Sequence, residues 1–181
     1  MLSRACAFTG HRPKSFPWKY DESAIGCVAL KNVLAEQIAA LADDGVTEFL
    51  SGMALGTDLW SAQIVLDLRI ENPLLRLHCI LPHVGQADKW SASARERYIA
   101  ILEQANTVDY VSRTYYDGCM IDRNHRLVNA AGLLLAVYNG VQRSGTGATV
   151  NYARRIGRKI IIIDPITLHI THEGPVSAIK L

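Results

Sequence analysis

Two glycines and several hydrogen-bonding side chains lie close together in the segment Ser51–Asp58, which has the sequence Ser-Gly-Met-Ala-Leu-Gly-Thr-Asp. A strand-like apolar run precedes this segment, and a helical pattern follows it. Glycine lets a backbone approach a phosphate closely, and the free N–H groups of a helix's first turn attract an anion. Thr57 or Asp58 is expected to cap the helix. The segment therefore predicts a phosphate site, although glycine turns of this kind are common in α/β proteins.

Two further glycine turns also follow apolar runs. The first is residues 9–13, Thr-Gly-His-Arg-Pro, and the second lies within residues 139–147. In the first turn, His11 and Arg12 are either ligand contacts at the end of a strand or solvated side chains of a surface loop. Ligands of open α/β sheets bind at the edge formed by the carboxyl ends of the strands. The three turns are therefore expected to share one ligand site there.

Strand-like and helical patterns alternate along the whole chain, with no linker, repeat or low-complexity segment. This alternation predicts a single α/β domain over residues 1–181, with a doubly wound, mostly parallel sheet and helices on both faces. The unbroken apolar runs 133–138 and 160–163 are typical of neighbouring or nearly neighbouring central strands. Strands are expected at residues 4–8, 46–50, 75–81, 107–112, 133–138 and 159–164, with 167–171 as a candidate edge strand, and helices at residues 23–42, 57–71, 91–104, 120–130 and 148–156.

Composition narrows the class of protein. Of 181 residues, 49% are hydrophobic and 20% are charged, which is a globular composition. The net charge of +2 is too small to indicate a nucleic-acid partner. No apolar run reaches the roughly 18 residues that a membrane span needs, and the first residues lack the apolar core of a signal peptide. We therefore expect a cytoplasmic protein with no membrane partner.

Cysteines and aromatic residues have ordinary structural explanations. None of the four cysteines forms a Cys-x-x-Cys pair, and Cys6 and Cys79 lie in expected strands, so buried thiols are predicted. Residues 15–22 are irregular and rich in aromatic side chains, which either pack against the sheet or stack on a planar ligand, packing being the commoner use. No metal site and no cofactor are expected.

The glycine motifs together resemble the YpsA-like family of the SLOG superfamily, which joins the Smf/DprA DNA-processing proteins to the Lonely-guy phosphoribohydrolases. The segment Ser51-Gly52-x-Ala54-x-Gly56-x-Asp58 is similar to the DNA-processing motif, with Thr57 where isoleucine is usual. The resemblance covers nearly the whole chain. It implies a Rossmann-like domain with a site for a nucleotide or a nucleotide-derived ligand.

The later part of the chain resembles the Lonely-guy pattern instead. Met120 and Arg123 match its Met-x-x-Arg helix, and Gly145 and Thr146 match its Gly-Thr turn, but Thr149 stands where that pattern has a glutamate. Glycosidic cleavage passes through an oxocarbenium-like state that a carboxylate usually stabilises, and threonine carries no such charge. Asp58 is an alternative carboxylate, but a helix cap or a ribose contact is the favoured role for it.

The leading hypothesis is a protein that binds a nucleotide or a nucleotide-derived small molecule, with a sensor role left open. Arg12 and Arg123 are expected to bind phosphate oxygens. The alternatives are a nucleoside 5′-monophosphate phosphoribohydrolase-like enzyme and a single-stranded DNA-binding protein; nucleic acid is not favoured as a partner, a homo-oligomer is left open, and no catalytic residue is assigned. The candidate ligand-binding residues are Gly10, His11, Arg12, Ser51, Gly52, Gly56, Thr57, Asp58, Arg123, Gly145, Thr146 and Gly147.

Overall fold

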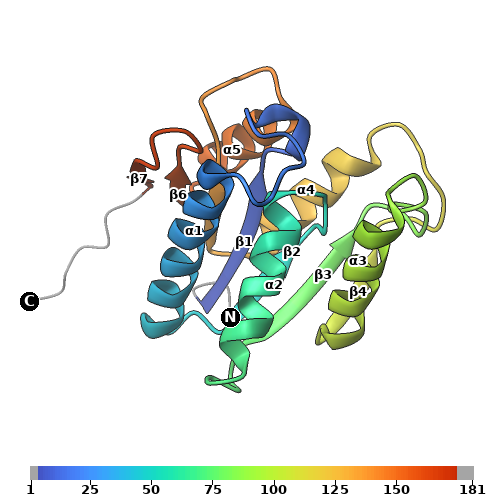
Figure 1. Cartoon of the computed structure of the whole chain (residues 1–181), viewed down its shortest axis with the longest axis horizontal. Coiled ribbons are helices and arrows are strands. Elements are labelled where there is room, and N and C mark those ends of the chain that lie inside the picture. The colour runs from blue at the N-terminus through green and yellow to red at the C-terminus, as the bar shows by residue number, and fades with distance from the viewer. Residues whose placement is uncertain (1–3, 175–181) are drawn as a thin grey trace, which may run out of the picture.

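The computed structural model describes residues 4–174, which form alternating strands and helices (Figure 1). The strands are β1 (Ala5–Gly10), β2 (Glu48–Ser51), β3 (Arg76–Leu81), β4 (Thr107–Tyr110), β5 (Leu133–Val137), β6 (Lys159–Ile163) and β7 (Ile170–Glu173). The helices are α1 (Ile25–Asp43), α2 (Thr57–Arg69), α3 (Ala92–Gln104), α4 (Cys119–Ala130) and α5 (Gly145–Arg155), with a short 3-10 turn, η2 (Pro13–Ser15), after β1.

The seven strands form one sheet in the order β4-β3-β2-β1-β5-β6-β7. All neighbouring pairs are parallel except β6 and β7. The predicted doubly wound, mostly parallel sheet is thereby confirmed, and β5 and β6 are direct neighbours as expected. The chain winds in one direction from β1 through β4 and in the other from β5, so the topological switch point lies between β1 and β5.

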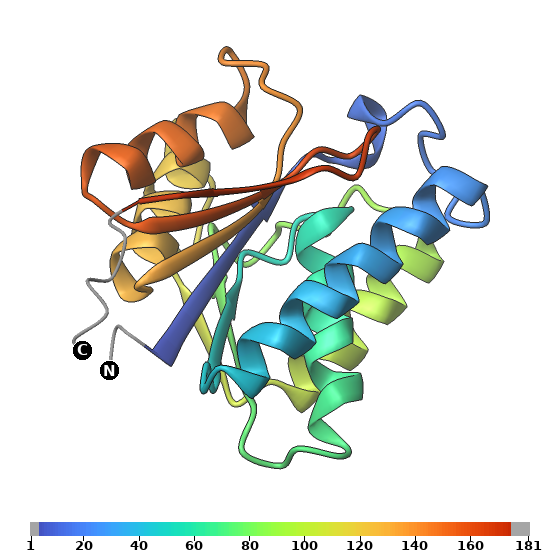
Figure 2. The ribbon, with the colours of Figure 1, turned by 90° about the vertical axis from the view of Figure 1, so that its left-hand side faces the viewer.

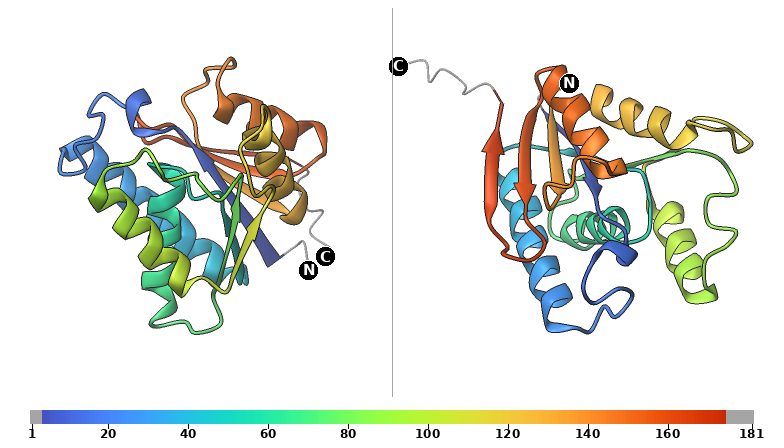
Figure 3. Two further views of the ribbon diagram at one scale, coloured as in Figure 1. Left: turned by 90° about the vertical axis from the view of Figure 1, so that its right-hand side faces the viewer. Right: turned by 90° about the horizontal axis from the view of Figure 1, so that it is seen from above.

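Helices cover both faces of the sheet: α1, α2 and α3 lie on one face, and α4 and α5 lie on the other (Figure 2). Two further views show the same three layers (Figure 3). Alternation along the strands supplies both cores, since Phe8 and Phe49 belong to the first core whereas Ala7 and Leu50 belong to the second. A buried central sheet of this kind fixes the positions of the loops at its carboxyl edge.

Two element boundaries differ from the sequence prediction. Helix α5 begins at Gly145, three residues before the expected start, because the Ser144 hydroxyl accepts the Gly147 N–H and caps the helix. The last strand was expected at residues 167–171 but occupies Ile170–Glu173. There, the Asp164 carboxylate accepts the N–H groups of the two residues at 166 and 167 and holds this segment as a turn.

Helix α1 is long and apolar enough, by length and composition, to cross a membrane. Five of its side chains are nevertheless buried within the protein: Cys27, Leu30, Leu34, Ile38 and Leu41. They belong to the core that includes Phe8 and Phe49 of the sheet. The apolar stripe of α1 therefore has a structural use in this layer.

The aromatic segment after η2 packs mainly within the protein, as predicted. Phe16 stacks on Trp18 and on Trp60 of α2, with ring centroids 5.0 and 5.5 Å apart. Glu22 follows and accepts hydrogen bonds from Trp60 Nε1 and Arg97. This segment therefore ties α1, α2 and α3 together near the carboxyl edge of the sheet. The four cysteines are likewise buried and free.

Candidate functional site

A cavity of about 360 Å³ opens at the carboxyl edge of the sheet, beside the switch point between β1 and β5. Its walls are the loop after β1, one face of α4 and the beginning of α5. The structure brings together seven predicted residues in its lining: Gly10, His11, Arg12, Asp58, Arg123, Gly145 and Thr146. The other predicted residues lie outside that lining: Ser51, Gly52, Gly56, Thr57 and Gly147.

The N-terminus of α5 supplies hydrogen-bond donors to the cavity. The Gly147 N–H bonds to the Ser144 hydroxyl at 2.9 Å, and the Ala148 N–H bonds to the Ser144 carbonyl. The N–H groups of Gly145 and Thr146 have no acceptor within residues 4–174, and both residues line the cavity. Unpaired N–H groups at a helix N-terminus, together with the helix dipole, favour an anion at this wall.

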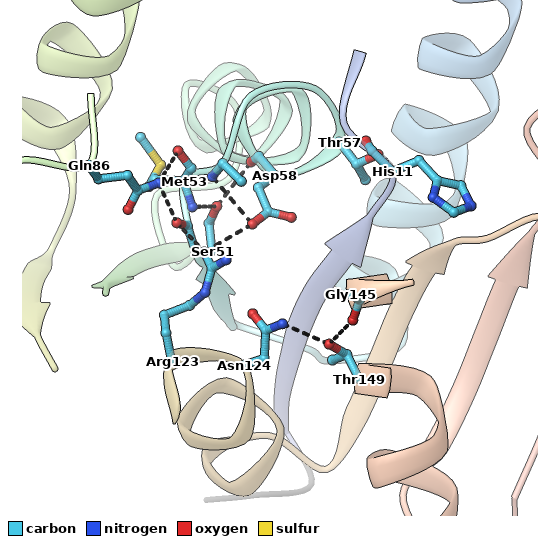
Figure 4. Close-up of polar contacts among 12 residues, drawn as sticks. His11, Ser51, Met53, Thr57, Asp58, Gln86, Arg123, Asn124, Gly145 and Thr149 are labelled. Atoms are coloured by element: carbon cyan, nitrogen blue, oxygen red, sulfur yellow. Dashed lines mark hydrogen bonds and ion pairs between the residues drawn. The ribbon is translucent and has the colours of Figure 1, made fainter. Parts of the chain in front are cut away.

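Asp58 and Arg123 form a buried ion pair at the inner wall, with 3.4 Å between Oδ2 and Nη1 (Figure 4). Burial raises the pKa of the Asp58 carboxyl, and the charges of Arg123 and Arg12 oppose that rise. Burial lowers the pKa of Arg123, but a guanidinium with an ordinary pKa above about 12 keeps its charge. We therefore describe these two residues as an ionised pair.

Each member of this pair has an atom without a hydrogen-bond partner among the described residues. Asp58 Oδ2 accepts from Arg123 and, at 3.4 Å, from the Ala54 N–H, whereas its Oδ1 makes no hydrogen bond within the described part of the chain. Arg123 also donates from Nη1 to the Gly52 carbonyl, but its buried Nε has no partner among the described residues. The Asp58 carboxylate thus leaves one acceptor at the cavity wall, whereas Arg123 Nε is buried beside Gly52.

The prediction that Thr57 or Asp58 caps the N-terminus of α2 is wrong. Gly56 is the N-cap residue of α2, and no side chain caps that end. The Thr57 hydroxyl donates instead to the His11 carbonyl at 3.2 Å, while Asp58 lies in the first helical turn and pairs with Arg123. A buried arginine competes for the carboxylate here, which the local sequence around Asp58 does not reveal.

Several predicted glycines allow close packing of protein against protein. A Cβ on Gly52 would overlap the Arg123 guanidinium, and one on Gly10 would overlap the Thr57 side chain. Gly56 has a φ of +90°, and a Cβ there would lie 2.9 Å from the His11 carbonyl oxygen. By contrast, a Cβ on Gly145 would meet nothing within 4 Å. Only Gly145 among these four therefore adjoins open space.

The turn Ser51–Asp58 is held by its own side chains and by Arg123 and Gln86 from elsewhere in the chain. Ser51 Oγ donates to the Asp58 carbonyl and accepts the Met53 N–H. Met53 has a φ of +55°, a left-handed conformation that costs a non-glycine residue energy and persists where its surroundings fix it. Gln86 Nε2 completes the arrangement by donating to the carbonyls of Gly52 and Met53 at 3.1 and 2.8 Å.

His11 connects the loop after β1 to the loop after β5. Its Nε2 lies 2.7 Å from Asn139 Oδ1 and 3.2 Å from the Asn139 nitrogen. Burial lowers the pKa of His11, and the Asn139 hydrogen bond opposes that change. The neutral imidazole is therefore favoured at neutral pH, and its main contact is structural.

Residues that the sequence analysis did not name as candidates also line the cavity. Lys14, Asn124, His125 and Ser144 line it, and Met120 joins Arg123 and Asn124 on one face of α4. The helical spacing of 120, 123 and 124 is the signal that could have identified Asn124. Thr149 occupies the position where a glutamate was expected; it donates to the Gly145 carbonyl and accepts from Asn124 Nδ2.

The chemistry of this site is that of polar recognition. Asp58 is the one carboxylate in its lining, and it already neutralises a buried arginine. Within residues 4–174 no group of three or more His, Cys, Asp or Glu side chains is arranged to hold a metal ion. Cations, free N–H groups and one carboxylate oxygen around a cavity of this size suit a phosphorylated, hydroxyl-bearing small molecule.

Fold and site together define a Rossmann-like α/β domain of the SLOG type. A model of the YpsA family, described as the YspA SLOG family, matches residues 6–167. The chain therefore belongs to the YpsA family, as the motifs predicted. Among curated proteins it is similar to UPF0398 proteins from Bacillus cereus (strain G9842) and Bacillus thuringiensis (strain Al Hakam), each 28% identical over 157 residues, 85% of this chain and 84% of the relative.

Solved structures with the same fold include two DNA-processing proteins A. The protein from Streptococcus pneumoniae superposes with a TM-score of 0.58 at 14% identity, over 97% of this chain and 52% of that one. The protein from Helicobacter pylori, described for its single-stranded DNA binding mode, gives 0.58 at 15% identity over 88% and 65%. This chain thus spans about half to two thirds of their lengths, and at these identities the likeness concerns the fold alone.

Proposed function

We propose that this protein binds a nucleotide or a nucleotide-derived small molecule in the cavity beside the switch point, in the cytoplasm. The observation that carries the proposal is the pair of acceptor-free N–H groups at Gly145 and Thr146, which line the same cavity as Arg12. Arg12 and Lys14 make no side-chain hydrogen bond or ion pair within the described residues, so their charges remain available for phosphate oxygens.

We assign recognition of the ligand's sugar to Asp58. Its Oδ1 accepts no hydrogen bond from the described residues, and it lies across the cavity from Gly145 and Thr149 (Figure 4). A carboxylate oxygen accepts hydrogen bonds from the hydroxyl groups of a ribose, whereas its negative charge repels a free inorganic anion. This arrangement favours a nucleotide over free phosphate.

Calorimetric titration with adenosine, guanosine, cytidine and uridine monophosphates tests the proposal. We expect at least one of them to bind the wild type and to bind Gly145→Ala about 10-fold or more weakly, because the added methyl group projects into the cavity. Arg12→Gln should have an effect of similar size. The matched control is Arg113→Gln, an exchange outside the cavity lining. Absence of binding by every monophosphate would contradict the proposal.

A sugar-specific comparison tests the role of Asp58. The ligand and its 2′,3′-dideoxy form should differ in affinity on the wild type, and this difference should be smaller on Asp58→Asn, because a neutral amide oxygen is a weaker acceptor than a carboxylate. If the dideoxy form binds the wild type as tightly as the parent nucleotide, Asp58 does not recognise the ribose.

Hydrolysis of the glycosidic bond is the weaker alternative. Thr149 cannot carry the charge expected of a catalytic carboxylate, and Asp58 is engaged with Arg123. We therefore expect no free base when adenosine monophosphate is incubated with the protein. Robust release of adenine that Asp58→Asn abolishes would support the enzyme instead.

Binding of single-stranded DNA would need a basic groove, and most candidate arginines are engaged within the protein. Arg123 is buried, Arg154 pairs with Glu173, and Arg158 donates to carbonyls of α4. A mononucleotide site contacts few phosphates, whereas each DNA phosphate neutralised adds roughly −0.7 to the slope of log affinity against log salt. We expect oligonucleotide binding to be micromolar or weaker near physiological salt, and tight binding with a steep slope would favour the DNA alternative.

A further inference from the structure

A second cavity, of about 570 Å³, lies on the other side of the loop that follows β1. Arg12 and Lys14 line both cavities, whereas Tyr20, Lys89 and Trp90 line only the second. The loop that carries Arg12 and Lys14 therefore forms a boundary between the two spaces. A ligand that crosses this boundary would contact both cations.

The second cavity has a different charge from the first. Among the described residues, three cationic side chains line it, Arg12, Lys14 and Lys89, and no carboxylate does. Within residues 4–174 none of these three makes a side-chain hydrogen bond or an ion pair. The first cavity, by contrast, contains Asp58. Negative charge is therefore also favoured at the boundary and in the second cavity, away from Asp58.

The second cavity also has aromatic side chains and a helix end. Tyr20 is 59% exposed, although Phe16 of the same segment, 15–22, is buried. Trp90 is held edge-on against Tyr98, with ring centroids 5.3 Å apart. Ser91, the N-cap of α3, lines the same cavity, and the N–H groups of the two residues after it have no acceptor among the described residues. Planar groups stack on such side chains.

We propose that the ligand is a nucleotide whose phosphates carry a second planar head group, in the manner of a pyrophosphate-linked dinucleotide. This inference rests on the proposed function, because it extends the same ligand. The nucleotide occupies the first cavity, the phosphates lie beside Arg12 and Lys14, and the second head group stacks on Tyr20 and Trp90. A diphosphate that bridges the two cavities would pair with both shared cations, Arg12 and Lys14. A mononucleotide confined to the first cavity does not need to contact both of them.

The test compares three ligands by calorimetric titration: adenosine monophosphate, adenosine diphosphate and diadenosine diphosphate. We expect diadenosine diphosphate to bind at least about 10-fold more tightly than adenosine diphosphate, as one additional stacked base provides. The diphosphate has the same number of phosphates and at least as much charge, so charge alone cannot produce this order. A gain therefore reports on the second head group.

Two variants locate that gain. Tyr20→Ala and Lys89→Gln change exposed side chains, so the fold is expected to survive both. Each should lower the affinity for diadenosine diphosphate several-fold and leave the affinity for adenosine monophosphate unchanged. Tyr115→Ala is the matched control, because Tyr115 is 62% exposed and lines neither cavity.

The outcomes separate this inference from the proposed function. If the monophosphate binds but diadenosine diphosphate binds no better than the diphosphate, the second cavity takes no head group and only this inference fails. An equal loss for all three ligands in Tyr20→Ala also overturns it. If none of the three ligands binds, this inference fails, and the proposed function fails with it where guanosine, cytidine and uridine monophosphates do not bind either. An oligothymidylate that binds more tightly than diadenosine diphosphate and depends on Tyr20 would assign the second cavity to single-stranded DNA.

Discussion

Two glycine turns enter helices at the same edge of the sheet, yet their polar groups face different partners. In the turn after β2, the Ser51 hydroxyl donates to the Asp58 carbonyl, Gln86 and Arg123 donate to the Gly52 carbonyl, and Asp58 pairs with Arg123. In the turn before α5, the N–H groups of Gly145 and Thr146 remain without an acceptor among the described residues and line the cavity. The first turn is connected internally, and the second offers donors to a ligand.

The comparison separates two uses of glycine that have the same appearance in a sequence. Gly10, Gly52 and Gly56 leave room for a neighbouring part of this chain, since an added Cβ would meet protein at each of them. Gly145 leaves room where no protein atom lies. A glycine-rich motif therefore indicates close approach, and only the tertiary structure shows whether the approaching group is protein or ligand.

Asp58→Ala should have the largest effect on stability. It would leave the Arg123 guanidinium buried without its counter-charge, which typically costs about 3–5 kcal/mol. Urea denaturation measures the change in the free energy of unfolding. The double variant Asp58→Ala/Arg123→Leu, which removes both charges, should be more stable than the single variant. A loss of only about 1 kcal/mol for Asp58→Ala would indicate a helix cap rather than a buried pair.

Gly52→Ala should have the next largest effect. The new Cβ would displace the Arg123 guanidinium from the Gly52 carbonyl, and a buried donor that loses its acceptor costs about 1–3 kcal/mol. Chemical denaturation of this variant and of Gly145→Ala makes a matched pair of glycine-to-alanine exchanges. Equal stability of the two variants would mean that Arg123 moves aside without a loss of stability. The interpretation that internal contacts hold the turn after β2 would then lose its main evidence.

Most of the fold could be predicted from the sequence because each element carries its own pattern. The unbroken apolar run of β5 indicated a strand buried on both faces, and the alternation with helices indicated parallel neighbours. The position of β7 could not be predicted, because it depends on the Asp164 carboxylate accepting N–H groups in a turn. That interaction overrides the weak strand preference of residues 167–169.

The site was predictable in its location and less so in its contacts. Arg12, Asp58, Arg123 and Gly145 do meet in one cavity, since the ends of parallel strands share an edge. The direction of the Arg123 side chain was not predictable. Asp58 is a neighbour of Arg123 only because α4 packs on the sheet over β1 and β3, which brings Arg123 to the first turn of α2.

Gly145→Ala should change stability least among the glycine variants. Its φ is not positive and its Cβ meets nothing within 4 Å, so alanine fits the first turn of α5. Alanine restricts the unfolded chain more than glycine does, which typically stabilises by about 0.4–1 kcal/mol. Thermal unfolding without ligand should therefore give an unchanged or slightly higher Tm. A clear fall in Tm would show that this turn, like the one after β2, is packed against protein.

The smallest effect is a pH dependence at His11, the residue that touches both turns. Its carbonyl accepts from Thr57 at the β2 side, and its ring bonds to Asn139 in the loop that leads to α5. Burial lowers the pKa of His11 in the folded state. Below the ordinary histidine pKa, the unfolded chain therefore binds a proton that the folded chain does not, and stability falls as the pH decreases through that value.

Denaturation of wild type and His11→Gln between about pH 5 and pH 7.5 isolates this contribution. The wild type should lose more stability toward pH 5 than the variant does, because glutamine keeps a polar contact available to Asn139 and does not titrate. The difference between the two slopes is the measured quantity, so a constant loss of ring packing against Phe16 cancels from it. Parallel pH profiles would mean that protonation of His11 in the folded protein costs no stability. The loop leading to α5 would then be as accessible to water at His11 as it is at Gly145.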